Sequence, residues 1–225
     1  MSDRVKRIGF PKKQGLYDPA NEKDSCGVGF VANVKGVPSH QIVLDAIQML
    51  KNMDHRGACG CEANTGDGSG ILTGLPWGFL EKVAREEMGV ELPAKGHFGA
   101  GLVFLPQIEA ERTKCIATVE GIIAEQGQTC LGWRAVPVQA DKADVGPSAR
   151  AAEPCIMQLF IGAAEGVEGD DFERQLYIIR KRASHQLRLD ASLEQALLFY
   201  ICSLSTKVMI YKGMLTTDQL FTYFG

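Results

Sequence analysis

The hydrophobic and polar positions alternate after the first 25 residues and then change to helical spacing. Residues 27–34 alternate and are rich in Val and Phe, which predicts a strand that ends at the Lys35-Gly36 turn signal. Ser39 has the chemistry of a helix cap. Apolar side chains then recur at the spacing of one helix face, at Ile42, Ala46, Ile47, Leu50 and Met53. The pattern therefore predicts a strand followed by an amphipathic helix.

The rest of the chain continues in blocks of strands and helices. The apolar runs predict strands at residues 72–76, 97–106, 129–138 and 155–161, and the second of these is apolar on both faces, as in a central strand. The periodicity predicts helices at residues 79–88, 108–126, 172–187 and 216–224. We expect loops at residues 53–72 and 139–153, and a two-residue Ser205-Thr206 hairpin turn between strands at 199–204 and 207–211. These blocks predict an α+β fold in which helices cover sheets.

The first 25 residues differ from the rest of the chain. They contain Pro11, Gly15, Pro19 and several charges but no periodic apolar pattern. We therefore expect residues 1–25 to be a leader outside the core and residues 26–225 to form the domain. The leader has no apolar segment of the kind found in a secretory signal.

Composition and charge exclude several classes of function. The 225 residues are 45% hydrophobic and 23% charged, with a formal net charge of −3, which argues against a disordered chain and against a nucleic-acid partner. No apolar run approaches the roughly 18 to 20 residues that span a bilayer, so we expect no membrane partner. The seven cysteines are odd in number and lie mostly in apolar runs, at positions 26, 59, 61, 115, 130, 155 and 202. This pattern predicts buried thiols in a reducing, cytoplasmic compartment.

Two segments are candidates for ligand or metal binding. The glycine-rich residues 64–70 lack the lysine of a P-loop and the spacing of a dinucleotide fingerprint, so we expect a structural turn or a backbone lying close to a small-molecule site. His55, Cys59 and Cys61 offer nitrogen and sulfur ligands, but the single C-x-C has no second half. The spacing therefore favours thiols without a metal.

Cys26 is the candidate nucleophile, and its chemistry allows two interpretations. Composition alone favours a small core residue at the start of a strand. The alternative is that removal of the leader gives Cys26 a free α-amino group, whose unperturbed pKa of about 7.7 to 8.0 suits a base for the thiol. The segment His55-Arg56-Gly57 also allows two interpretations. Either His55 and Arg56 are a solvated surface pair, or the loop returns Arg56 to the end of the sheet at which Cys26 lies.

Several motifs together resemble one family. The segments "GLYDPANEKDSCGVGFVANVKG", "HRGACGCEANTGDGSGIL", "LGWRAVPV", "EPCIMQLFIG" and "FYICSLSTKVMIYKGMLTTDQL" are similar to the amino-terminal part of glutamate synthase large subunits. That part is a class II glutamine amidotransferase domain, which is an N-terminal-nucleophile hydrolase. The resemblance covers residues 15–220.

The resemblance implies a fold, a substrate and a set of site residues. The fold is a four-layer α-β-β-α sandwich, here incomplete at its C-terminal side. The substrate is L-glutamine, which the Cys26 thiolate attacks after the leader is removed, so that ammonia leaves and water hydrolyses the thioester. Arg56 and Gly57 match the family's HRG element and are expected to shape the site, and no metal is expected in it.

The resemblance also implies what lies elsewhere. The family's glutamine-binding arginine and Asn-Gly oxyanion hole come from HSRFSTNT-like and HNGEINT-like motifs, neither of which is present, so we expect a truncated chain. An alternative function is then a catalytically incompetent fold or interaction module. FMN, an iron–sulfur cluster, the other synthase domains and an electron-donating subunit are expected of the complete enzyme, and this segment is expected to hold no cofactor.

Overall fold

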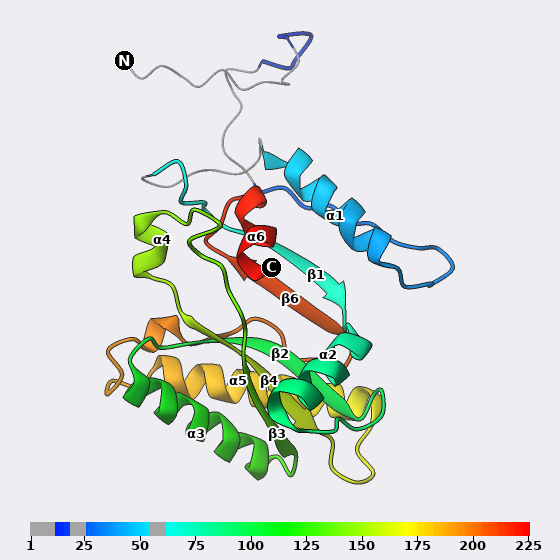
Figure 1. The fold of residues 1–225 in the computed structure, drawn as a ribbon, viewed down its shortest axis with the longest axis vertical. Helices are drawn as coiled ribbons and strands as arrows, with labels where there is room; N and C mark the ends of the chain where they lie inside the picture. Colours follow the sequence, from blue (N-terminus) through cyan, green and yellow to red (C-terminus); the bar gives the residue numbers. More distant parts are fainter. Residues whose placement is uncertain (1–11, 19–25, 55–61) are drawn as a thin grey trace.

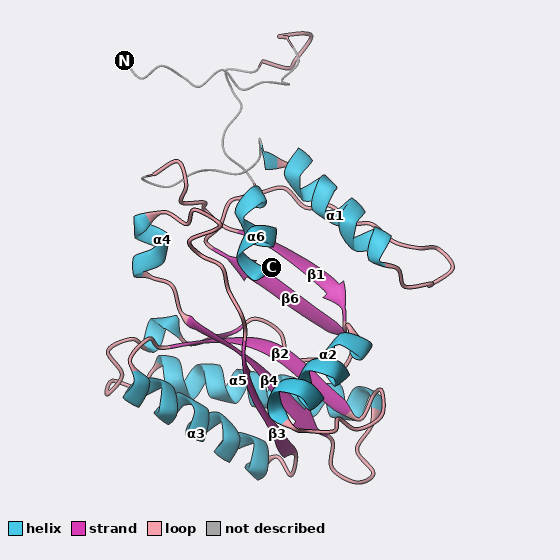
Figure 2. Ribbon diagram, viewed as in Figure 1, coloured by secondary structure: helices cyan, strands magenta, loops and turns pink. Residues whose placement is uncertain are grey.

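The computed structural model describes residues 12–18, 26–54 and 62–225, which form helices and two antiparallel sheets (Figures 1 and 2). The helices are α1 (His40–Asn52), α2 (Trp77–Val83) with the π-helical turn Ala84–Met88, α3 (Glu109–Glu125), α4 (Pro147–Ala151), α5 (Gly169–Arg188), the 3₁₀ turn Ala196–Leu198, and α6 (Thr217–Phe224). The strands are β1 (Ser69–Gly74), β2 (Phe98–Leu105), β3 (Thr129–Ala135), β4 (Cys155–Gly162), β5 (Tyr200–Ile201) and β6 (Val208–Gly213).

The elements are stacked in layers, as Figure 1 shows. Helices α3 and α5 lie below a four-stranded sheet of order β3-β4-β2-β5. A two-stranded sheet, β1-β6, lies above that sheet, and α1 and α6 lie beside it at the other end of the molecule. The predicted α+β sandwich is therefore confirmed in its arrangement of helix, sheet, sheet and helix.

Strand β2 is central and contributes to both cores of the described chain. Val103 and Leu105 belong to the core that α3 and α5 cover, and Phe98 and Leu102 belong to the core that also contains β6 and α6 residues. All four side chains are fully buried. This alternation follows from the period of two in a strand, and it confirms the prediction of a central strand that is apolar on both faces.

Most predicted elements are found within a few residues of their expected bounds. Ser39 caps α1 through its side chain, which accepts a hydrogen bond from the backbone N–H of Ile42 at 3.4 Å. Thr216 and Gln219 form a capping box at the start of α6. The predicted loop 139–153 is wrong in one respect, because it contains the short helix α4, which begins with Pro147.

The predicted strand at residues 27–34 is wrong. These residues have no regular structure, and Val28, Phe30 and Val34 are 94%, 89% and 103% exposed. An alternating pattern predicts a strand only where a neighbouring strand supplies hydrogen bonds, and no strand of the described chain pairs with this segment. Only the turn at its end, with Gly36 at φ +67°, is as predicted.

The predicted hairpin around Ser205-Thr206 is also wrong. β5 pairs with β2, whereas β6 pairs with β1 in the other sheet. Ser205 instead exchanges backbone hydrogen bonds with Ala100, at 3.1 and 3.2 Å. The chain between β5 and β6 is therefore a crossing from one sheet to the other. The apolar pattern of residues 199–211 resembles that of a hairpin because β5 and β6, on either side of the crossing, are both partly buried.

Within the described residues, no helix combines the length and hydrophobicity that a membrane span requires.

Candidate active site

Cys26 lines a large groove in the part of the chain that the structure describes. The groove has a volume of ≈ 960 Å³ and takes its walls from both sheets and from α1, α4 and α6. Leu50 comes from α1, Met53 is the C-cap residue of that helix, and Ile71 comes from β1. Phe104 and Ile156 come from the four-stranded sheet. The walls are thus mainly apolar, and the exposed Cys26 thiol is available to a molecule in the groove.

Other described thiols have a different environment. Cys115 and Cys202 are buried, and burial raises the pKa of Cys115 to about 11 and that of Cys202 to about 12. These two side chains confirm the prediction of buried core thiols. A thiol held protonated in this way is a poor nucleophile, because the thiolate is the reactive form. Cys26 differs from these two thiols because it is exposed, and it departs from the core role that composition favours.

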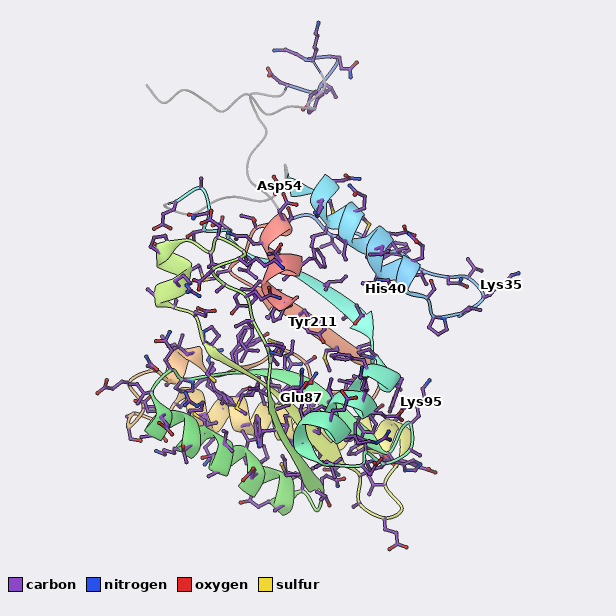
Figure 3. All side chains as sticks on the ribbon, in the orientation of Figure 1. Lys35, His40, Asp54, Glu87, Lys95 and Tyr211 are labelled. Carbon is purple, nitrogen blue, oxygen red and sulfur yellow. The ribbon has the colours of Figure 1, made fainter. Side chains whose placement is uncertain are left out.

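The C-terminal end of α1 is fixed to the start of α6. Thr217 Oγ1 donates to Asp54 Oδ1 at 2.9 Å, and Lys51 Nζ lies 3.1 Å from Asp218 Oδ1. Figure 3 shows Asp54 at this end of α1, next to α6. The contact holds one wall of the groove in place beside Met53 and Thr217, which both line it.

The predicted site residues Arg56 and Gly57 lie outside the described residues. So do His55, Cys59 and Cys61, the candidates for metal ligands. The roles of Arg56 and Gly57 stay predictions. Within the described part of the chain, no three His, Cys, Asp or Glu side chains are grouped as a metal site requires. The presence of FMN and an iron–sulfur cluster in the complete enzyme stays a prediction.

The glycine-rich segment is packed tightly against the chain that leads into α6. A Cβ atom at Gly66 would lie 2.4 Å from the carbonyl oxygen of Leu215, and one at Gly70 would lie 2.8 Å from Lys212 Cβ. Asp67 and Gly68 line the groove. These contacts confirm that the glycines allow close approach of backbones at a groove, as expected from the sequence.

Two polar side chains that the sequence did not single out hold this segment. Gln219 Nε2 donates to the carbonyl oxygens of Asn64 and Asp144, at 2.8 and 2.9 Å. The Glu62 carboxylate accepts from Ser148 at 2.6 Å and from Thr65 at 2.5 Å, and these hydrogen bonds lower the pKa of Glu62. The glycine-rich segment is thereby attached to both α4 and α6. The capping-box pattern could have indicated Gln219, although not its partners.

The groove also has polar positions on its walls. Glu153 accepts a hydrogen bond from Tyr223 at 2.7 Å, and its other oxygen lies 3.0 Å from Arg150. Burial, followed by this hydrogen bond, raises the pKa of Tyr223. Lys212 and Tyr200 form a second polar position, where Lys212 Nζ lies 4.0 Å from the centroid of the Tyr200 ring.

The comparison with known protein families shows which family the chain belongs to. A model of the class II glutamine amidotransferases matches residues 26–225, so that its first matched residue is Cys26. The chain belongs to the class II glutamine amidotransferases. The family predicted from the sequence motifs is therefore confirmed, as is the N-terminal-nucleophile hydrolase class of the fold.

Individual relatives in this family are glutamate synthases. The chain is 40% identical over 217 residues to the NADPH glutamate synthase large chain of Bacillus subtilis. It is 42% identical over 223 residues to the NADH glutamate synthase of Schizosaccharomyces pombe, and 39% identical over 210 residues to ferredoxin-dependent glutamate synthase 1 of Arabidopsis thaliana. The matches cover 96%, 96% and 93% of this chain but only 14%, 10% and 13% of the relatives. The amidotransferase thus resembles one domain of much longer enzymes.

Proposed function

We propose that this amidotransferase domain hydrolyses L-glutamine to glutamate and ammonia, as the glutaminase part of a glutamate synthase. The observation that carries the proposal is the coincidence at Cys26. It is the first residue of the family match, and it is an exposed thiol that lines the groove. Core thiols such as Cys202 offer no comparable access.

The reaction starts with removal of residues 1–25, which leaves Cys26 with a free α-amino group. An amine with an unperturbed pKa of about 7.7 to 8.0 can take the thiol proton near neutral pH. The Cys26 sulfur then attacks the side-chain amide carbon of glutamine. The C–N bond breaks, the amine returns its proton to the leaving nitrogen, and ammonia departs.

The second half of the reaction returns the enzyme to its starting state. Water adds to the carbonyl carbon of the glutamyl thioester, the C–S bond breaks, and glutamate leaves with the Cys26 thiol regenerated. Arg56 and Gly57 are proposed to shape the site near the nucleophile. The ammonia is proposed to aminate 2-oxoglutarate in the remaining synthase domains, where FMN, an iron–sulfur cluster and an electron donor are expected.

Glutamine hydrolysis by the full-length natural protein tests this proposal. Cys26→Ala should lower the rate by at least about 1000-fold, as loss of a nucleophile does in other covalent catalysts. Cys130→Ala is the matched control, because Cys130 is a partly buried thiol packed against the core that α3 and α5 cover. This variant should keep the wild-type rate. Intact mass should show an amino terminus at Cys26.

Two results would overturn the proposal. Hydrolysis at the wild-type rate by the Cys26→Ala protein would assign the chemistry to another residue. No hydrolysis by the wild-type protein would favour the alternative function, a non-catalytic fold or interaction module.

A further inference from the structure

Gln219 is a buried polar side chain whose whole amide group is engaged in hydrogen bonds. The residue is 7% exposed. Its Oε1 atom accepts a hydrogen bond from the Thr216 backbone N–H at 2.9 Å. Its Nε2 atom donates to the carbonyl oxygens of Asn64 and Asp144, at 2.8 and 2.9 Å, so both protons of the NH₂ group are used. A buried amide that is satisfied in this way is held in one orientation.

The amide group joins α6 to two segments that are distant from it in the sequence, and all three contribute to the Cys26 groove. Asn64 begins the glycine-rich segment, from which Asp67 lines the groove. Val145 and Thr217, which directly follow the other two bonded residues, line it as well. In Figure 1, α6 lies between α4 and α1 at this end of the molecule. One side chain therefore connects three parts of the groove wall.

The glycine-rich segment and the loop before α4 approach each other closely. The Gly146 N–H donates to the same Asn64 carbonyl oxygen at 2.9 Å, and a Cβ atom at Gly146 would lie 2.1 Å from Thr65 Oγ1. Asp144 has φ +49° and is the one residue other than glycine, among those the structure describes, with a positive φ. Such a conformation persists where surrounding contacts hold it, and the hydrogen bond from Gln219 is one of these contacts.

Gln219 acts on the groove from behind, because it is not itself one of the lining residues. Without its two donors, α6 keeps the hydrogen bond from Ser69 Oγ to the Thr216 carbonyl oxygen at 3.0 Å but loses its bonds to Asn64 and Asp144. The first half of the glycine-rich segment is then free to shift relative to α6. The expected effect is on the shape of the groove and not on direct contact with a ligand.

We propose that Gln219 is a positioning residue for the glutaminase proposed above, on which this assignment rests. Gln219 fixes the glycine-rich wall relative to Cys26, so that a bound glutamine presents its amide carbon to the sulfur. Orientation of this kind has a large effect on rate, since a misplacement of about 1 Å costs about 100-fold. Gln219 therefore acts through the wall, whereas Cys26 carries the chemistry.

Kinetics of the full-length natural protein, after removal of the leader, test the assignment with Gln219→Glu. This variant keeps an oxygen that can accept from the Thr216 N–H, but it replaces the NH₂ group, so at most one of the two carbonyl oxygens retains a donor. It should lower kcat for glutamine hydrolysis by about 10- to 100-fold and change KM by less than about threefold. Gln219→Met removes both donors without adding a charge and should lower kcat in the same way.

Alkylation of Cys26 by iodoacetamide separates positioning from damage to the nucleophile. The rate, read at Cys26 by peptide mass spectrometry, should be the same in wild type, Gln219→Glu and Gln219→Met, because a small reagent needs no orientation by the wall. Thr216→Val is the matched control on the same helix. It removes the hydroxyl that accepts from the Gln219 backbone N–H at 3.3 Å, and so weakens the cap of α6, but it leaves the donors of the Gln219 side chain in place. Its kcat, KM and alkylation rate should equal those of wild type.

The outcomes distinguish this assignment from the proposed glutaminase. Wild-type kcat in Gln219→Glu and Gln219→Met would overturn the assignment alone. An equal loss of kcat in Thr216→Val would do the same, because the effect would then follow the stability of α6, as would a matching loss in the alkylation rate of Cys26. A wild-type protein that hydrolyses no glutamine would overturn the proposed glutaminase, and this assignment with it.

Discussion

At the scale of single residues, Gly101 shows how closely the chain packs where it crosses between sheets. A Cβ atom at Gly101 would lie 1.7 Å from the carbonyl oxygen of Ser203, a backbone atom that cannot move aside by changing a rotamer. We predict that Gly101→Ala lowers the free energy of unfolding by about 3 kcal/mol or more, measured by urea denaturation. Gly121→Ala, in α3, is the control, because no atom lies within 4 Å of the added methyl group. It should stabilise the protein by about 0.5 to 1 kcal/mol.

A second residue-scale prediction concerns the buried Arg134 guanidinium, which makes a two-pronged pair with Glu87. Arg134 Nε and Nη2 lie 2.6 and 2.8 Å from the two carboxylate oxygens, and the Arg134 side chain is 7% exposed. Figure 3 shows Glu87 where the helices after β1 meet the four-stranded sheet. Glu87 itself is 46% exposed, so breaking this pair costs less than breaking a fully buried one. We therefore predict that Glu87→Gln lowers the free energy of unfolding by about 1 to 3 kcal/mol.

The pH dependence of this pair has a definite sign. Hydrogen bonding from Arg134 lowers the pKa of Glu87 in the folded protein. The pair therefore contributes stability above the unfolded pKa of about 4.3, and this contribution is lost as the pH falls through the lower folded pKa. The free energies of unfolding of the wild-type and Glu87→Gln proteins, measured with urea, should become equal in that acidic range. Glu91→Gln is the control, because it removes only the exposed Arg85–Glu91 pair and should leave the free energy of unfolding nearly unchanged. A constant gap between wild type and Glu87→Gln down to pH 2 would contradict the prediction.

At the scale of elements, α6 holds the glycine-rich segment, residues 64–70, in place through hydrogen bonds. Gln219 completes the capping box of α6 and also donates to the carbonyl oxygens of Asn64 and Asp144. Gln219→Ala should lower the free energy of unfolding by about 2 to 3 kcal/mol, because it removes the side-chain half of the capping box and leaves the partly buried carbonyl oxygens of Asn64 and Asp144 without that donor. Hydrogen exchange should speed up at the Thr65 and Gly146 amides, which belong to the same turn network. Asp218→Ala removes only an exposed pair with Lys51 and should leave both amides as protected as in wild type.

The elements that could be predicted from the sequence are those whose pattern depends on burial alone. β2, β4, α3 and α5 lie against the same cores that their periodicity indicates. The predictions for residues 27–34 and 199–211 are wrong, because a strand depends on which partner strand is available and an apolar pattern does not identify that partner. The same distinction applies to the residues of the candidate site. A local motif identifies Cys26, whereas Lys212 and Tyr200 meet only through the pairing of β6 with β1 and of β5 with β2.

At the scale of the whole molecule, the two sheets are joined by the crossing at residues 203–207, and Glu173 of α5 anchors it. The Glu173 carboxylate accepts hydrogen bonds from the Thr206 backbone N–H at 2.6 Å, from the Thr206 hydroxyl at 2.5 Å and from the Ser205 hydroxyl at 3.1 Å. A single side chain in the helix layer thus fixes the segment from which β6 continues to the groove. Its loss should therefore affect the two sheets unequally.

We predict that Glu173→Ala destabilises the protein by about 2 to 4 kcal/mol, because buried donors at Ser205 and Thr206 lose a charged acceptor. Hydrogen exchange should rise more in β1 and β6 than in β3 and β4, since the latter pair with each other away from the crossing. Glu173→Gln keeps one acceptor oxygen and should lose less. Arg174→Ala is the neighbouring control and removes only an exposed pair with Asp171. An equal rise in exchange across both sheets of the Glu173→Ala protein would mean that the two sheets unfold as one unit and that the crossing does not set their separate stabilities.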